Sequence, residues 1–290
     1  MELNMRRIRI LSWIIFVTMF FATCLSMCVP ASDVMAYEGA YYCDDGYGGE
    51  GESIDVSYTV TYDSYVENRD YYVSSAPSYS KVSNDHSNDC ASKTGGNIVG
   101  FYDRYYTNLI SNFDPGILMG STYVYFPYAG IPAIRTMIES LYDLMEINVN
   151  ASGATKQDFM DGLTEYVEGK GYDISFSSFY GNTTTVNLNQ VRQMVQNNKV
   201  GVLMCSRYNY IYAINHSSSG TSTYISQRNF NIGHMMMVYG YITIDFYNEG
   251  IKTKSETFLQ VSSGFDSGDQ GYIKMDDYLN IDDALIVNIE

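Results

Sequence analysis

Two residues of this chain have the types that nucleophilic acyl transfer requires. Cys90 stands at the start of a helical pattern, and His234, 144 residues later, opens the apolar run 235–241. A thiolate that is activated by an imidazole attacks an amide carbonyl and forms a thioester, which water then hydrolyses. Each residue also has a structural interpretation, as a buried or disulfide-bonded cysteine and as a hydrogen-bonded core histidine. The helix and strand patterns around the two residues help to decide between these interpretations.

The pattern that follows Cys90 predicts an amphipathic helix. Its apolar residues recur with helical spacing, and they are Ile98, Phe101, Tyr102, Tyr105 and Leu109. Ser92 and Thr94 are candidate cap or first-turn residues. The unpaired N–H groups and the dipole of a helix N-terminus stabilise an anion, so a cysteine at this position is a candidate nucleophile.

The three histidines of the sequence lie in different contexts. His86 falls in a polar stretch and His216 lies beside a serine-rich turn, so both are expected in exposed loops. His234 precedes a run that is typical of a buried central strand. An imidazole at the rim of such a strand is a candidate general base.

The elements that would position the two residues follow in a definite order. Three further helices are expected to begin near Pro132, Thr155 and Leu188. Strands are then expected at residues 200–205, 208–214, 234–244, 257–261 and 284–289. Helices followed by an antiparallel sheet predict an α+β fold, with Cys90 in the helical N-terminal half and His234 in the sheet half.

Three segments together resemble the C39-like peptidase family of the papain-like superfamily. They are the cysteine helix at 90–103, the histidine strand with its Gly-Tyr end at 233–241, and a third motif at 260–265 that leads to 271–273. The separation of 144 residues between Cys90 and His234 also lies within the roughly 130–150 residues typical of papain-like enzymes. The resemblance covers about residues 84–275. It implies a papain-like fold and a bacterial cysteine peptidase without metal or organic cofactor.

The resemblance also implies roles for other residues. Asn84 and the backbone N–H of Cys90 would hold the oxyanion, at about 3–4 kcal/mol per donor, although Asn88 competes with Asn84. Asp266 or Ser262 would orient His234. Serine accepts a hydrogen bond from the imidazole but does not stabilise an imidazolium as a carboxylate does.

The sequence departs from the family pattern near the nucleophile as well. Ser92 and Lys93 stand where the family prefers Pro and Thr. Asp89, next to Cys90, would disfavour a thiolate. In the third motif, Ser262 or Ser263 replaces the usual Asn or Asp, and Asp266 or Asp269 would have to fold back to supply the charge.

The N-terminal region predicts export. Residues 1–36 resemble a secretory signal, with a basic start, an apolar run at 10–29 and a small-x-small pattern at 34–36; an uncleaved membrane anchor is the alternative. Residues 37–85, rich in Tyr, Gly, Ser and Asp, are expected to be a largely flexible leader or pro-segment with one strand near 54–62. Residues 86–290 are the expected papain-like domain.

Charge and cysteine count exclude several classes of partner and site. A formal charge of −16 argues against nucleic acid and anionic membrane surfaces as partners. Without the signal, the cysteines are Cys43, Cys90 and Cys205. This odd number excludes a disulfide scaffold, while Cys43–Cys90 and Cys90–Cys205 pairing both stay open. No cysteine or histidine spacing supports a zinc site.

The sequence thus predicts a secreted cysteine peptidase that acts on a peptide or protein substrate. One alternative is an inactive papain-like domain that serves as a surface binding or adhesion module. Another is an amidase or transferase that acts on cell-wall peptides. Substrate choice would be set by loops such as 112–130 and 215–232, and the sequence does not indicate an oligomeric state.

Overall fold

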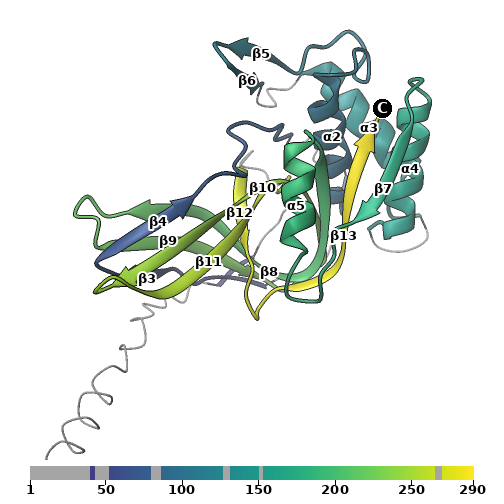
Figure 1. The fold of residues 1–290 in the computed structure, drawn as a ribbon. Coiled ribbons are helices and arrows are strands. Elements are labelled where there is room, and N and C mark those ends of the chain that lie inside the picture. Colours follow the sequence, from purple (N-terminus) through teal and green to yellow (C-terminus); the bar gives the residue numbers. More distant parts are fainter. Residues whose placement is uncertain (1–39, 43–51, 80–85, 127–130, 150–152, 265–269) are drawn as a thin grey trace, which may run out of the picture. The chain divides into compact units, whose positions relative to one another are not determined.

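Helices precede most of the sheet along the chain, as the sequence predicts (Figure 1). The computed structural model describes residues 40–42, 52–79, 86–126, 131–149, 153–264 and 270–290. All the strand pairings within this part of the chain are antiparallel. The α+β class is therefore confirmed.

The described helices are α2 (Cys90–Asp103), α3 (Pro132–Leu144), α4 (Lys156–Glu168) and α5 (Leu188–Gln196). The start of α2 has no side-chain cap: its N-cap is Asp89, and the hydroxyls of Ser92 and Thr94 donate to backbone carbonyls. The other three helices start at local sequence signals. α3 carries proline in its first turn. A capping box between Thr155 and Asp158 begins α4, and the side chain of Asn187 accepts two backbone N–H groups at the start of α5.

The large sheet is organised around one long strand. β8 (Val200–His216) pairs with β9 (Ser222–Phe230), β10 (His234–Asn248), β12 (Gln270–Lys274) and β13 (Asn280–Ile289). β11 (Ile251–Ser262) lies between β10 and β12, and β7 (Ile174–Ser178) pairs with β13. The sequence predicts two strands at 200–205 and 208–214. They form one strand because its first part pairs with β10 and β13 and its second part with β9 and β12.

Part of the expected flexible leader belongs to this sheet. β2 (Glu52–Asp55) and β3 (Tyr58–Thr61) pair with β9, and β4 (Ser64–Asn68) pairs with β10. Tyr58, Val60 and Tyr62 are buried in a cluster with apolar residues of β8 to β11. The expectation of flexibility is therefore corrected for residues 52–79, because the later strands supply both the pairing edges and the apolar surface.

Other parts of the N-terminal expectation lie outside the described residues. These are the signal at 1–36 and the remainder of the leader, apart from β1 (Ala40–Tyr42), which pairs with β2. Among the helices of the described part, none is long and apolar enough to cross a membrane. The expected loop 112–130 contains a hairpin of β5 (Gly116–Met119) and β6 (Thr122–Tyr125).

The helix that carries Cys90 is buried on all sides. Two glycines allow α3 to approach closely: a Cβ atom at Gly96 would lie 2.7 Å from Cγ1 of Ile138, and one at Gly95 would lie 2.9 Å from Cε of Met145. Tyr79 packs against Gly100, where its hydroxyl leaves no room for a Cβ atom. The α2 helix is thereby fixed between α3, the end of the leader and β10.

Candidate active site

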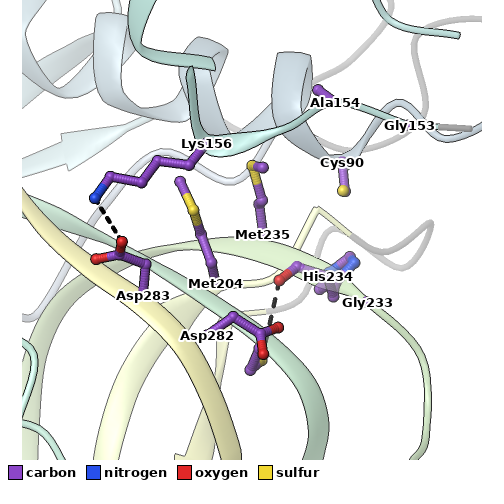
Figure 2. Close-up of a pocket in the computed structure, with 11 residues that line it drawn as sticks. Cys90, Gly153, Ala154, Lys156, Met204, Gly233, His234, Met235, Asp282 and Asp283 are labelled. Atoms are coloured by element: carbon purple, nitrogen blue, oxygen red, sulfur yellow. Dashed lines mark hydrogen bonds and ion pairs between the residues drawn. The ribbon is translucent and has the colours of Figure 1, made fainter. Parts of the chain in front are cut away.

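Cys90 and His234 come together in one pocket. Cys90 is the first residue of α2 and His234 is the first residue of β10. They are 8% and 6% exposed, and both line a pocket of about 320 Å³. In Figure 2 the sulfur of Cys90 points from the helix terminus toward His234. The fold thus brings together two residues that the sequence selected 144 positions apart.

A hydrogen bond from α2 to β10 connects the two elements next to the site. The hydroxyl of Thr94 donates to the backbone carbonyl of Met235 at 2.9 Å. Thr94 lies one turn after Cys90, and Met235 directly follows His234. The bond therefore sets the position of the cysteine helix relative to the histidine strand.

Asp89, which the sequence places as an unfavourable neighbour of the nucleophile, has a cationic partner. Nζ of Lys93 lies 2.9 Å from Oδ1 of Asp89, and the two side chains are only 4% and 6% exposed. The positive charge of Lys93 offsets the negative charge beside Cys90. Lys93 thus compensates for Asp89.

The imidazole of His234 is oriented by a backbone carbonyl. Nε2 lies 2.8 Å from the carbonyl oxygen of Ser263. A carbonyl only accepts, so Nε2 carries a hydrogen and Nδ1 is the basic nitrogen of the neutral ring. This contact fixes the tautomer that a general base requires.

His234 is a neutral imidazole at neutral pH. Burial lowers the pKa of His234 to about 4; the hydrogen bond to Ser263 acts in the opposite direction, and the charge of Lys93 lowers the pKa further. The ring of Tyr208 stacks on the imidazole, with 5.8 Å between centroids. A neutral base is able to accept a proton from a thiol.

Residues 260–265, the third of the segments singled out in the sequence, contact His234 through their main chain. The hydroxyl of Ser262 donates to the carbonyl of Pro77 at 2.5 Å, so this candidate holds the end of the leader. The contact with the imidazole comes from the next residue, Ser263, through its carbonyl. Sequence reasoning missed it because a main-chain acceptor leaves no residue-type signal.

Other predicted site residues lie outside the described residues. Asn84 falls in 80–85, and Asp266 and Asp269 fall in 265–269. Their roles stay predictions. Asn88, the competitor of Asn84, donates from its side chain to Oδ1 of Asn148 at 2.7 Å.

Cys205 also lines the pocket, but it differs from Cys90. Within the described residues, neither of the two cysteines is disulfide-bonded, so the Cys90–Cys205 pairing is wrong, while Cys43 lies outside these residues. Sγ of Cys205 contacts the carbonyl of His234 at 4.0 Å, and burial raises its pKa well above the ordinary value. A thiol in that setting is a poor nucleophile, which leaves Cys90 as the candidate.

The other histidines lie elsewhere. Nδ1 of His216 is 2.7 Å from the hydroxyl of Thr223, and its ring stacks on Tyr65 of β4. His86 stacks on Tyr142. Across the described ranges, no group of three or more His, Cys, Asp or Glu residues could hold a metal ion.

The far wall of the pocket was not selected from the sequence. It carries Met204, Lys156, Asp282 and Asp283. Two adjacent carboxylates directly before the apolar run 284–287 were the available signal.

No protein-family model, curated protein or solved structure matches this chain.

Proposed function

We propose that this protein is a secreted cysteine peptidase that cleaves peptide bonds through a thioester on Cys90. The observation that carries the proposal is the shared pocket of Cys90, at a helix N-terminus, and His234, whose Nε2 is held by Ser263. A papain-like arrangement of helix and sheet accounts for this pairing. Export rests on the signal-like pattern at 1–36.

The buried imidazole favours proton transfer during attack over a preformed ion pair. Nδ1 of His234 takes the proton of Cys90 as Sγ bonds to the substrate carbonyl carbon. The imidazolium then gives that proton to the leaving amine, and water hydrolyses the thioester. The carbonyl of Ser263 accepts a charge-assisted hydrogen bond from the imidazolium, which partly replaces the carboxylate of other thiol hydrolases.

The oxyanion would be held at the start of α2. The backbone N–H of Cys90 and the side chain of Asn84 are the proposed donors, and the positive end of the helix dipole favours the same charge. Lys93 neutralises Asp89 next to this position, so the negative charge that develops there meets less repulsion.

Among the alternatives, the inactive binding module is less well supported. Its expected sign is a cysteine tied in a disulfide or placed away from the histidine. In the described residues, Cys90 forms no disulfide and lines the same pocket as His234. A cell-wall amidase or transferase would use the same pair of residues.

The proposal is tested with a fluorogenic peptide library and a peptidyl acyloxymethyl ketone, read by intact mass. We expect cleavage of some peptides and one covalent adduct on Cys90. Cys90→Ala should abolish both, and His234→Ala should slow cleavage by about 10²–10⁴-fold. Cys205→Ala is the matched control and should retain activity. Folded protein that cleaves no peptide, and whose labelling is unchanged by His234→Ala, would overturn the proposal.

A further inference from the structure

The pocket continues from Cys90 and His234 to an acidic wall that the proposed mechanism does not use. Asp282 and Asp283 of β13 form this wall together with Lys156, the first residue of α4. In Figure 2, Met204 and Met235 lie between Cys90 and the Lys156–Asp283 pair, and Asp282 lies below them on the side of His234. The pocket therefore has a reactive end, an apolar middle and a charged end.

A β-bulge brings Asp282 to this position. Ile281 pairs with Cys205 and Asp283 pairs with Met204, so Asp282 is the extra residue between two neighbouring positions of β8. A bulge re-aims a side chain, and bulges are frequent beside active sites. Here the bulge lies opposite Cys205 and Met204, which themselves line the pocket.

The charges of the wall do not cancel. Nζ of Lys156 lies 2.5 Å from Oδ2 of Asp283, and this ion pair offsets both charges. Asp282 is exposed to solvent and has no ion-pair partner among the lysine, arginine and histidine side chains of the described residues. One negative charge is therefore left at the end of the pocket.

The carboxylate of Asp282 is held in place by a short chain of hydrogen bonds. Ser206 donates from Oγ to Oδ1 of Asp282 at 3.2 Å, and Asn280 donates from Nδ2 to Oγ of Ser206 at 2.7 Å. Both donors are neutral, so they orient the carboxylate without removing its charge.

We propose that this end of the pocket is a subsite for the cationic side chain of a Lys or Arg residue next to the scissile bond. The inference rests on the proposed peptidase function. Lys and Arg have an apolar stem and a charged head. Met204 and Met235 offer adaptable apolar surface to the stem, and Asp282 receives the head. The volume of about 320 Å³ is that of a small ligand site.

Other side chains fit this wall less well. An acidic side chain would be repelled by Asp282. A neutral aliphatic side chain would cover the carboxylate without giving it a partner, which costs free energy. The preference should therefore follow charge and not length.

The test uses matched peptides in which Arg is replaced by citrulline, or Lys by acetyl-lysine, at each position beside the scissile bond. We expect kcat/KM to be at least 10-fold higher for the charged member at one position. Asp282→Asn should reduce this ratio to near one, because a neutral amide no longer favours the charged side chain over citrulline. Asp277→Asn, an exposed aspartate outside the pocket, is the matched control and should keep the ratio. Asp282→Lys should reverse the preference toward Glu.

A binding measurement separates failure of the subsite from failure of the proposed function. Fluorescence anisotropy of the same labelled peptides with Cys90→Ala protein requires no chemistry. Tighter binding of the Arg peptide that is lost in Cys90→Ala/Asp282→Asn would support the subsite even if the wild type cleaved nothing. Equal cleavage and equal binding of the Arg and citrulline peptides would overturn the subsite and leave the peptidase function intact.

Discussion

The hydroxyl of Thr94 and the backbone carbonyl of Met235 are joined by a buried hydrogen bond of 2.9 Å. This bond connects the helix that begins with the candidate nucleophile to the strand that begins with the candidate base. Cys90 and His234 come from opposite halves of the domain. Their relative position therefore depends on such contacts between α2 and β10.

We expect Thr94→Val to reduce activity through misalignment. The change leaves the carbonyl of Met235 without this donor, at a cost of about 1–3 kcal/mol in the free energy of unfolding. A shift of about 1 Å between reacting groups can cost about 10²-fold, so kcat should fall by about 10–100-fold with little change in KM. Thr94→Ser keeps the hydroxyl and should retain most of the activity. An unchanged kcat in folded Thr94→Val would contradict the alignment role.

The buried imidazole of His234 predicts a pH dependence of stability. Its pKa of about 4 in the folded protein lies below the roughly 6.5 of an unfolded histidine. Between these values the unfolded chain binds more protons, so the free energy of unfolding falls as the pH falls from about 6.5 to 4. Once the pH lies below both pKa values, this group has lowered the free energy of unfolding by about 3 kcal/mol. Above pH 7 the imidazole is neutral in both states and causes no pH dependence.

Urea denaturation of wild type and His234→Gln between pH 4.5 and 7.5 measures this effect. Asp103 changes the free energy of unfolding in the same pH range but in the opposite direction. Burial raises the pKa of its carboxyl to about 6, so its contribution to stability is lost as the pH rises. The difference between wild type and variant removes the effect of Asp103. Parallel curves for the two proteins would show that His234 is not a buried neutral base.

The ion pair of Lys93 and Asp89 should matter for both stability and reactivity. Lys93→Met removes the cation that lies 2.9 Å from the buried carboxylate, a change that typically costs about 3–5 kcal/mol. The remaining negative charge beside Cys90 should also slow its alkylation by iodoacetamide at pH 7. Intact mass reads the alkylation rate, and a Cys43→Ala/Cys205→Ala background removes the other two thiols of the chain without its signal from the assay.

Asp89→Asn/Lys93→Met is the control for this pair. It removes both charges, so it should regain most of the alkylation rate and part of the stability. If the single and double variants were alkylated equally slowly, Lys93 would act through packing and not through its charge.

Local signals made the helices predictable. The capping box of Thr155 and Asp158, the first-turn proline of α3 and the apolar spacing after Cys90 all act within a few residues. The position of residues 52–79 was not predictable in this way. The partners of β3 and β4 are strands more than 150 positions later, and composition does not reveal such pairing.

The residues of the candidate site also differ in whether local sequence reveals them. Cys90 and His234 were found because their side-chain chemistry and context are visible in the sequence. The Ser263 carbonyl was not, since any residue supplies a carbonyl. The position of Asp282 depends on a bulge in the pairing of β13 with β8. The register of a strand pair is determined by both strands, so the sequence of β13 alone does not reveal it.

The adjacent serines Ser262 and Ser263 should respond differently to substitution. Ser262 uses its hydroxyl to hold Pro77, whereas Ser263 uses its backbone carbonyl to orient His234. Ser262→Ala removes the bond to Pro77 and should lower the free energy of unfolding by about 1–3 kcal/mol. It should also increase proteolytic cleavage near residue 77, with activity retained in the folded fraction. Ser263→Ala keeps the carbonyl that holds Nε2 of His234, so its pH–activity profile should match that of the wild type. Loss of activity in folded Ser262→Ala, without increased proteolysis, would instead assign the orientation of His234 to the Ser262 hydroxyl.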